Sequence, residues 1–587
     1  MTEKKFTHDG KGILVVVFHA YANNATSLSS VIDAVKKQWP NAQMYCPDLP
    51  LSWFSTANPN EIVNLHLNQL DTIIQQSENG TNPITNIILI GHSFGALLAR
   101  KLYIVACGET RKAPFEACYF RSESSLDNGR LAARYWAKRV SRLILMAGMN
   151  RGWSISHHMS ITKAPLWTLG VILGHLLYAF KHRPPAILTI RRGAEFITQL
   201  RVQWLYMRRE YASDSKAGGN AITIQLLGSR DDIVSPDDNI DLISGGDFIY
   251  LDVPYSGHKS IIELYDSDYG QSRFSVFIKA LILSPSELAS DNILPADERV
   301  TKADESVTQV AFVIHGIRDA GYWTHKLARR IQVPDNEKWA TETSSYGYFP
   351  MLPFLFPLYR RKKVEWLMDQ YTEALAKYPK ASFSYVGHSN GTYLLARALE
   401  LYPCCTFKNV VFAGSVVRQD FNWHKYLNSS PPRVNAVLNF VATTDWVVAF
   451  FSKLFQFAHW QDLGSAGHDG FILSNPHPRI HQLTYIKGGH GAAIEEPLWD
   501  HIASFIRNGK LPSKNNIPLS LSRTKWIAIT SHFPPIAWIL VGAITWGVWL
   551  AIKYLIQLLT PLQSQDYATG FSLAIYILIL WLLLTKI

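Results

Sequence analysis

Two serines stand in the same glycine-rich pattern, which can supply a nucleophile. The pentapeptide Gly-His-Ser-x-Gly occurs around Ser93 as GHSFG and around Ser389 as GHSNG, each time directly after an apolar run. Glycines two residues before and two residues after the serine remove side chains that would block a tight strand-to-helix turn. Such a turn, a nucleophile elbow, projects the hydroxyl from the edge of a sheet. Its duplication predicts two nucleophilic serine sites in one chain.

The residues on either side of each serine fit the elements that an elbow needs. Residues 86–90 (NIILI) and 382–386 (SFSYV) have the composition of buried strands. Residues 96–103 and 392–399 have the apolar spacing of helices. A strand before and a helix after both serines make the signal more specific than the motif alone.

Length and composition limit the classes of protein that fit. At 587 residues the chain is too long for one core, and its formal charge of +11 is a modest excess typical of a soluble protein or a membrane surface. No motif points to nucleic acid. The five cysteines have no disulfide-framework or zinc-site spacing, which favours a reducing compartment. The first twelve residues lack the apolar stretch of a cleaved signal peptide, so secretion by that route is not expected.

The two halves of the chain repeat the same order of segments. An apolar run ends in a histidine at His19 and again at His315, and each histidine precedes its elbow serine by 74 residues. Residues 141–153 likewise correspond to 408–423. Equal spacing predicts the same path through two domains, 10–283 and 307–510. The acidic, proline-containing residues 284–306 between them are expected to form a linker.

The order strand with His, strand with elbow serine, strand with Asp, strand with His resembles the α/β-hydrolase superfamily. The resemblance covers about residues 12–283 and 308–509. The second half also resembles bacterial α/β-hydrolase domains of unassigned substrate. The resemblance implies an α/β fold with two tandem domains, each a mostly parallel central sheet flanked by helices, with triads in the order Ser, Asp or Glu, then His.

For the first domain the resemblance implies Ser93 as the nucleophile. His258, in the turn after residues 248–253, is the candidate base that takes the serine proton. Asp231 lies where the family places the acid that orients the imidazole and stabilises its charged form. Asp232 and Asp237 are alternatives later in the same loop.

For the second domain the same comparison implies Ser389 as the nucleophile, Asp445 as the acid and His490 as the base. Asp462 and Asp469 are the alternative acids. The residue types of a complete triad are therefore available twice.

An oxyanion hole for each site would need two backbone N–H donors aimed at the developing charge. The second domain has the family's His-Gly pair at Gly316, whereas the first has Ala20, so the two loops are expected to differ. The expected donors are one residue of the loop after the first strand and the residue after each serine: Tyr21 and Phe94 in the first domain, Ile317 and Asn390 in the second.

The two domains differ in their insertions. The first has about 80 extra residues between its serine and its acid, predicted to form a cap at about 150–220. Its apolar stretch 164–180 and the basic residues that follow would suit an anionic membrane surface, or equally a cap helix packed over an acyl pocket. The aromatic stretch 346–363 of the second domain could be a lid, a substrate wall or core.

Residues 526–587 are predicted to form a transmembrane hairpin. The runs 533–559 and 567–584 are almost wholly apolar, and each is long enough to cross about 30 Å of hydrocarbon as a helix. The connection carries no Lys or Arg, whereas basic residues flank the hairpin, so both ends and the two domains are expected to face the cytoplasm. The alternative is a hairpin buried against the second domain.

Together these features predict a membrane-anchored serine hydrolase that cleaves ester or thioester bonds, with lipids or acylated molecules as substrates and with no metal or organic cofactor. A peptidase or amidase is an enzymatic alternative, because the same triad cleaves amides. A membrane-tethered interaction or scaffold protein with catalytically silent domains is the main alternative from another class. A membrane-damaging effector is a third possibility.

Overall fold

The computed structural model describes residues 9–585 except 109–125, 128–129, 132, 156–158, 160–162, 182, 212–217, 242–247, 266–267, 289–290, 292–302, 320, 333–337, 459–461, 474–475, 514, 516 and 561–563. Most of the expected linker 284–306 lies outside the described residues, as does Cys118. The chain divides into two compact units. One consists of Met1–Ala303 with Tyr371–Lys377 and Tyr402–Cys404, and the other of the remaining residues.

The first unit is built on six parallel strands in the order β2-β1-β3-β6-β7-β8. Because parallel strands are covered on both faces, their side chains are buried almost without interruption. Along β1, Leu14, Val16 and Phe18 belong to the core on one face, and Val15 and Val17 to the core on the other. The strands are β1 (Ile13–Phe18), β2 (Gln43–Tyr45), β3 (Asn86–His92), β6 (Val140–Met146), β7 (Ile222–Gly228) and β8 (Phe248–Val253).

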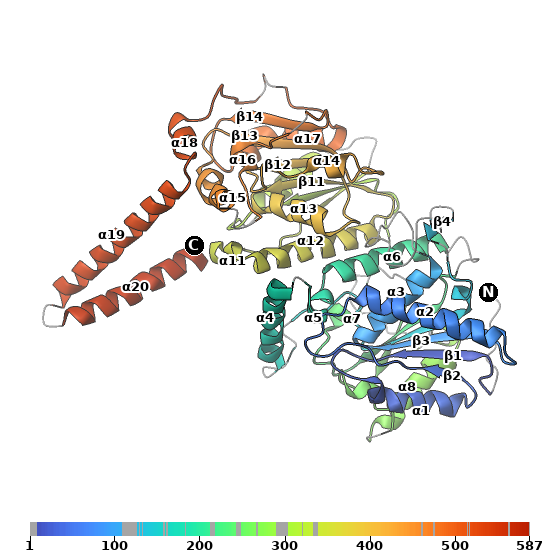
Figure 1. Ribbon diagram of the computed structural model, residues 1–587. Helices are drawn as coiled ribbons and strands as arrows, with labels where there is room; N and C mark the ends of the chain where they lie inside the picture. The colour runs from blue at the N-terminus through green and yellow to red at the C-terminus, as the bar shows by residue number, and fades with distance from the viewer. Residues whose placement is uncertain are drawn as a thin grey trace. The chain divides into compact units, whose positions relative to one another are not determined.

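Helices cover both faces of this sheet (Figure 1). Helices α2, α3 and α6 contribute to one apolar core, and α1 and α8 to the other. The short strands β4 (Leu126–Asp127) and β5 (Arg130–Leu131) pair apart from the sheet. The helices are α1 (Ser29–Gln38), α2 (Pro59–Glu78), α3 (Phe94–Cys107), α4 (Lys163–Lys181), α5 (Ala186–Thr189), α6 (Glu195–Tyr211), α7 (Pro236–Asn239), α8 (Gly270–Ile282) and α9 (Pro285–Leu288).

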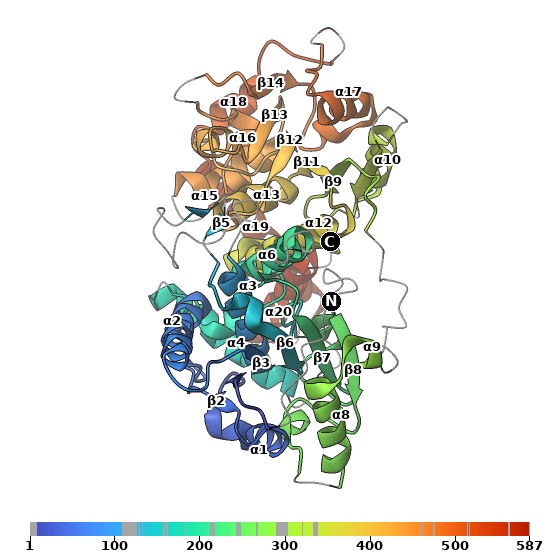
Figure 2. The same cartoon turned by 90° about the vertical axis from the view of Figure 1, so that its right-hand side faces the viewer.

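The second unit repeats this sheet. Its six parallel strands have the order β10-β9-β11-β12-β13-β14, which matches the first sheet position by position. Helices α10 and α17 pack on one face, and α13 lies against the other (Figure 2). The strands are β9 (Gln309–Ile314), β10 (Trp339–Glu342), β11 (Ser382–His388), β12 (Phe407–Ala413), β13 (Val434–Ala442) and β14 (Ile480–Ile486).

The helices of the second unit lie between these strands and after the last of them. A π-helical turn, η7 (Val447–Ser452), directly precedes α15. The helices are α10 (Tyr322–Ile331), α11 (Met351–Leu355), α12 (Pro357–Lys377), α13 (Asn390–Leu401), α14 (Trp423–Leu427), α15 (Lys453–Phe457), α16 (Ala466–Asp469), α17 (Glu496–Asn508) and α18 (Lys525–Thr530).

Two long apolar helices, α19 (Pro535–Leu559) and α20 (Gln565–Thr585), follow the second sheet and lie side by side. The stretches Trp538–Leu559 and Gln565–Leu582 are long and apolar enough to cross a membrane. Only 6% and 11% of their residues are buried. A core helix of a soluble protein is mostly buried, and these two helices differ from such a helix in their exposure.

The insertion predicted at about 150–220 contains α4, α5 and α6, between β6 and β7. Several of its arginines make their contacts within the first unit. Arg201 is 1% exposed and pairs with Asp241 at 3.0 Å, while Arg192 pairs with Asp238 at 2.6 Å. Buried acids therefore neutralise these two arginines of the predicted basic surface, whereas Lys181 and Arg183 remain exposed.

Candidate active site

Both elbow serines lie on sharp turns between a strand and a helix. Ser93 separates β3 from α3 with a φ of 54°, and Ser389 separates β11 from α13 with a φ of 51°. This left-handed conformation is strained for a residue with a side chain, and such strain concentrates at functional sites. A Cβ on Gly95 would collide with the carbonyl oxygen of Phe18, so the helix packs this closely on β1 only because that residue is glycine.

The first unit brings a serine, a histidine and an aspartate together in one hydrogen-bonded row. Ser93 Oγ lies 2.9 Å from His258 Nε2, and His258 Nδ1 lies 3.0 Å from Asp231 Oδ2. Each side chain follows a different strand at the carboxyl edge of the sheet: β3, β8 and β7, respectively. The row therefore depends on parallel strands that deliver their loops to the same edge.

Asp231 is held as an ionised acceptor. Its Oδ1 accepts the backbone N–H groups of Ile233 at 3.0 Å and Val234 at 2.9 Å, while Oδ2 faces His258. Burial opposes ionisation, but the hydrogen bonds and charge of His258 and the two backbone donors outweigh it, so the pKa of Asp231 is lowered. An ionised Asp231 accepts a hydrogen bond from the Nδ1–H group of His258, which leaves Nε2 without a proton and able to take one from Ser93.

The histidine of each motif, His92 and His388, supports the candidate base, a role that the sequence analysis did not assign. His92 Nε2 donates to the carbonyl oxygen of His258 at 2.8 Å, and His388 Nε2 does the same to His490 at 3.3 Å. Burial, together with the neighbouring histidine, lowers the pKa of both His92 and His388 to about 3. Both rings are therefore neutral, and their repeated place before the serine was the signal available in the sequence.

The second unit contains the same residues but a less complete row. His490 Nδ1 lies 3.0 Å from Asp445 Oδ2 and 3.1 Å from Oδ1. Within the described part of the chain, Ser389 Oγ makes no hydrogen bond to His490. The base and acid are thus paired while the serine stands apart from them.

The charges of the second pair are tuned in opposite directions. Burial by itself would lower the pKa of His490. The neighbouring Asp445 carboxylate has the larger, opposite effect, so the pKa of His490 is raised. Burial opposes ionisation of Asp445, but His490 and the Val448 N–H, which donates to Oδ1 at 3.0 Å, lower its pKa. The pair can therefore hold a proton on the imidazole more firmly than a free histidine does.

The alternative acids of the first unit have other surroundings. Asp232 forms an ion pair with Lys163. Asp237 is exposed on α7. Neither is hydrogen-bonded to His258, whose Nδ1 faces Asp231.

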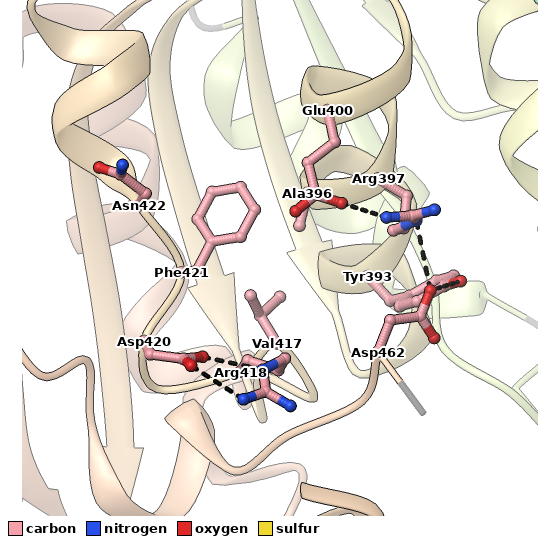
Figure 3. A pocket seen from close by; sticks show the side chains of 10 residues that line it. All are labelled: Tyr393, Ala396, Arg397, Glu400, Val417, Arg418, Asp420, Phe421, Asn422 and Asp462. Atoms are coloured by element: carbon pink, nitrogen blue, oxygen red, sulfur yellow. Dashed lines mark hydrogen bonds and ion pairs between the residues drawn. The ribbon is translucent and has the colours of Figure 1, made fainter. Parts of the chain in front are cut away.

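The alternative acids of the second unit serve other partners as well. Asp462 pairs with Arg360 and Arg397 and lines a cavity of about 290 Å³ beside α13 (Figure 3). Asp469 binds Lys453 and Arg523. Asp445 is the acid that faces His490.

The loops after β1 and β9 have the same local structure. Ala22 and Arg318, three residues after the strand-terminal histidine in each unit, adopt the left-handed conformation with φ of 57° and 51°. His19 Nδ1 lies 2.8 Å from the carbonyl oxygen of Ala20, and the corresponding distance from His315 to Gly316 is also 2.8 Å. The methyl group of Ala20 leaves these two features in place.

Of the four residues expected to supply oxyanion donors, two directly follow the serines and two lie in the loops after β1 and β9. Among the described residues, no hydrogen-bond acceptor is bound by their backbone N–H groups, which therefore remain available to a substrate oxygen. These residues are Tyr21 and Phe94 in the first unit, and Ile317 and Asn390 in the second.

Comparisons with protein-family models and with curated protein sequences find no match. Among solved structures, the chain is similar to mature lipase BlEst2 from Bacillus licheniformis (12% identity, TM-score 0.27, 48% of this chain and 96% of that one). It is also similar to a monoacylglycerol lipase from Paleococcus ferrophilus (12%, 0.26, 46% and 93%) and to phospholipase PlaB from Legionella pneumophila (19%, 0.23, 37% and 39%). Both halves have an α/β architecture with a six-stranded parallel sheet. The predicted fold class is confirmed by the two parallel sheets with their flanking helices.

The first unit has an aromatic wall beside its elbow serine. The Tyr21 ring lies 6.4 Å from Phe94 and 6.0 Å from Trp53, and Trp167 of α4 lies 5.4 Å from Trp53 and 5.2 Å from Trp153. An open cavity of about 600 Å³ lies along the loops that contain Ala22–Asn24 and Leu49–Ser55. An apolar wall next to a nucleophile suits an apolar substrate group better than a charged one.

Neither unit has a metal-site arrangement in the part of the chain that the structure describes, where no group of three His, Cys, Asp or Glu side chains could hold an ion. Among the described residues, four cysteines are thiols that form no disulfide bond: Cys46, Cys107, Cys404 and Cys405. Burial raises the pKa of Cys107 to about 12, so this thiol is a poor nucleophile.

Proposed function

We propose that the chain is a membrane-anchored serine hydrolase that cleaves carboxylic ester or thioester bonds of lipids or other acylated molecules. The observation that carries the proposal is the row Ser93, His258, Asp231 on a strained elbow, with two unbound N–H groups beside it. A nucleophile, a base, an orienting acid and oxyanion donors are the set that acyl transfer requires.

The first half of the reaction forms an acyl-enzyme. Ser93 Oγ attacks the substrate carbonyl carbon while His258 Nε2 takes the hydroxyl proton. The negative charge that develops on the carbonyl oxygen is bound by the N–H groups of Tyr21 and Phe94. His258 then gives its proton to the leaving oxygen or sulfur, the bond to that atom breaks, and the acyl group remains on Ser93.

The second half removes the acyl group. A water molecule takes the place of the leaving group, and His258 Nε2 accepts one of its protons as the oxygen attacks the acyl carbon. Collapse of this second tetrahedral intermediate returns the proton to Ser93 Oγ and releases a carboxylic acid. Asp231 remains ionised throughout, because it stabilises the imidazolium form without taking its proton.

For the second hydrolase domain we propose the same roles for Ser389, His490 and Asp445, with Ile317 and Asn390 as oxyanion donors. Hydrogen bonds of catalytic groups are often long without substrate and shorten when it binds, so the unattached serine is compatible with this role. The assembled row in the first domain supports a larger contribution from Ser93 than from Ser389.

The membrane part of the proposal depends on two features. Helices α19 and α20 would cross the bilayer with both ends in the cytoplasm, since Lys510, Arg523 and Lys525 precede them and the connection at 560–564 has no basic residue. The outer face of α4 would rest on the lipid surface. Its exposed apolar side chains recur at helical spacing: Leu166, Leu169, Ile172, Leu173, Leu176 and Phe180.

Covalent labelling with a fluorophosphonate probe tests the proposal. The wild-type chain should be labelled, and the double variant Ser93→Ala, Ser389→Ala should not. If the wild type takes no label and hydrolyses no short-chain ester, the interaction-protein alternative is favoured. Matched ester and amide substrates separate the esterase from a peptidase. A comparison of cellular lipids between wild type and double variant then identifies the substrate class.

The absence of a hydrogen bond between Ser389 and His490 favours one alternative for that domain, a binding module without turnover. Labelling of the Ser93→Ala variant decides this point, since only Ser389 remains to react. Toxicity on expression that disappears in the Ser93→Ala variant would instead support a membrane-damaging effector.

A further inference from the structure

The second oxyanion loop is held by a tyrosine hydroxyl that has no counterpart in the first domain's loop. Tyr346, in the loop after β10, is 7% exposed, and its hydroxyl lies 2.8 Å from the carbonyl oxygen of Gly316 and 2.9 Å from that of His315. One hydroxyl proton is thus shared between two carbonyl oxygens. Burial raises the pKa of Tyr346 well above its usual value, so the hydroxyl stays protonated and remains a donor.

The bond to Gly316 fixes the direction of one expected oxyanion donor. The carbonyl group of Gly316 and the N–H of Ile317 belong to the same planar peptide and point in opposite directions. A hydroxyl that holds the carbonyl oxygen therefore also orients the N–H. This peptide is next to the nucleophile, because a Cβ on Gly316 would lie 2.8 Å from Ser389 Cβ and 3.3 Å from its Oγ.

The same hydroxyl holds the residue that supplies the other donor. The side-chain amide of Asn390 donates to Tyr346 Oη at 3.2 Å, and Asn390 is fully buried directly after Ser389. The Tyr346 ring is itself held in place. It stacks on His315 with centroids 4.4 Å apart and an interplanar angle of 27°, and its edge packs against Trp366 at 5.4 Å.

The first domain closes its loop by other means. The carbonyl oxygen of Ala20, which corresponds to that of Gly316, accepts the backbone N–H of Asn23 at 3.3 Å. Phe94, which corresponds to Asn390, has no side-chain donor. The tyrosine contact is therefore particular to the second domain.

We propose that Tyr346 is a positioning residue of the second site, whose hydroxyl orients the Gly316–Ile317 peptide and Asn390 so that both backbone N–H groups point at one substrate oxygen. This inference rests on the proposed function of Ser389. The effect is on the transition state, in which the carbonyl oxygen carries negative charge, rather than on binding of the neutral ester.

The test uses the full chain with Ser93→Ala, so that only the second site reacts. In this background, Tyr346→Phe removes the hydroxyl and keeps the ring. We expect kcat for a short-chain oxoester to fall about tenfold to a hundredfold, somewhat less than the loss typical of deleting an oxyanion donor, while KM changes little. Tyr322→Phe is the matched control, because Tyr322 is 79% exposed at the start of α10 in the same domain, and it should leave both constants unchanged.

A thionoester of the same acyl group separates positioning from a general loss of structure. Its sulfur is a weaker hydrogen-bond acceptor than oxygen, so it depends less on the oxyanion donors. Tyr346→Phe should therefore lower the ratio of oxoester to thionoester kcat, and Asn390→Ala should lower it to a smaller extent. Equal losses for both esters, or an oxoester kcat within twofold of the parent, would overturn the proposal.

Thermal unfolding of each variant, followed by circular dichroism, checks that the domain is folded. If Tyr346→Phe does not fold, the ratio of oxoester to thionoester kcat is measured for Asn390→Ala instead. If the Ser93→Ala parent takes no fluorophosphonate label and hydrolyses neither ester, the proposed function of the second site fails, and the inference fails with it. If the Ser93→Ala parent is labelled and Tyr346→Phe leaves kcat unchanged, the inference about Tyr346 is rejected while the proposed function of the second site stands.

Discussion

The two domains share a sheet order, an elbow and a similar loop after the strand that precedes it, yet their candidate bases differ in whether they are hydrogen-bonded to the serine. In the first domain, His258 connects Ser93 to Asp231 through hydrogen bonds of 2.9 and 3.0 Å. In the second, His490 contacts Asp445 but has no hydrogen bond to Ser389 within the described residues. A conserved elbow therefore does not fix the position of the base, which is set by loops that follow other strands.

One residue after the neighbouring strand accounts for part of this difference. Ala147 follows β6 and Gly414 follows β12, both in the left-handed conformation with φ of 47° and 54°. A Cβ on Gly414 would lie 2.8 Å from His490 Cε1 and 2.9 Å from Nδ1. The ring and the carbonyl oxygen of His490 thus pack directly on a residue without a side chain, whereas the first domain has an alanine at the corresponding position and His258 is hydrogen-bonded to Ser93.

The largest expected loss of activity comes from replacing Asp231, the acid of the hydrogen-bonded row in the first domain. Asp231→Asn, tested in a Ser389→Ala chain, should lower kcat for ester hydrolysis about 10⁴-fold, because an amide donor at this position favours the histidine tautomer with its proton on Nε2. Asp232→Asn serves as the control, since that carboxylate pairs with Lys163. Retention of most activity by Asp231→Asn would remove Asp231 from the proposed triad.

A smaller loss is expected when the support of the base is removed. His92→Ala should lower kcat of the first site by roughly tenfold, the equivalent of one lost buried hydrogen bond of about 1–2 kcal/mol. His388→Ala should affect the second site less, since its bond to His490 is 3.3 Å long against 2.8 Å in the first domain. Steady-state kinetics in the two single-site backgrounds measure both losses, and a larger loss for His388→Ala would contradict this ranking.

Exchanging the residue after β12 tests the cause of the difference directly. Gly414→Ala in a Ser93→Ala chain should displace His490 towards Ser389 and increase the rate of fluorophosphonate labelling severalfold. Ala147 has almost the same φ, so the backbone tolerates alanine. A slower rate of labelling in a folded variant would show that His490 already stands in its productive place.

A weaker effect is expected on the outer face of α4. Ile172→Asp places a charge among exposed apolar side chains and should lower hydrolysis of an ester presented in lipid vesicles a few-fold. Turnover of a water-soluble short-chain ester should not change, and Thr168→Asp on the same helix is the matched control. Equal losses with both substrates would point to a folding defect instead of a membrane contact.

The smallest expected effect is a shift along the pH axis. The raised pKa of His490 means that the imidazole loses its proton above the usual value of about 6.5. Because only the neutral ring accepts the serine proton, kcat/KM of the second site should rise with pH and reach half its maximum above that value. A pH profile of the Ser93→Ala chain with its midpoint at or below 6.5 would contradict the shift.

The sequence by itself determined the architecture. Two elbows, each between a buried strand and a helix, together with equal lead-ins from His19 and His315, predicted two α/β domains, and both sheets confirm this. Two helices long and apolar enough to span a membrane were also predicted. These features depend on local spacing and composition, which a single sequence contains in full.

The candidate Ser, Asp and His of each site were also predicted from the sequence, since they follow three strands in the order Ser, Asp, His along the chain. The sequence could not tell whether each histidine reaches its serine, because Ser93 and His258 are 165 residues apart and meet only at the edge of the folded sheet. The contact of Tyr346 with the carbonyl oxygen of Gly316 was hidden for the same reason.

Only the tertiary structure decided how charge is distributed within the cap. The arginines of 191–209 resemble a basic surface in the sequence, but Arg201 faces Asp241 in the core, an acid 40 residues further along the chain. The tertiary structure also decided that Gly414, rather than Ala413, is the residue of the second domain that corresponds to Ala147 of the first. Contacts between distant loops depend on how the strands align in space. That alignment follows from the hydrogen-bond register across the sheet, which cannot be read from the order of residues.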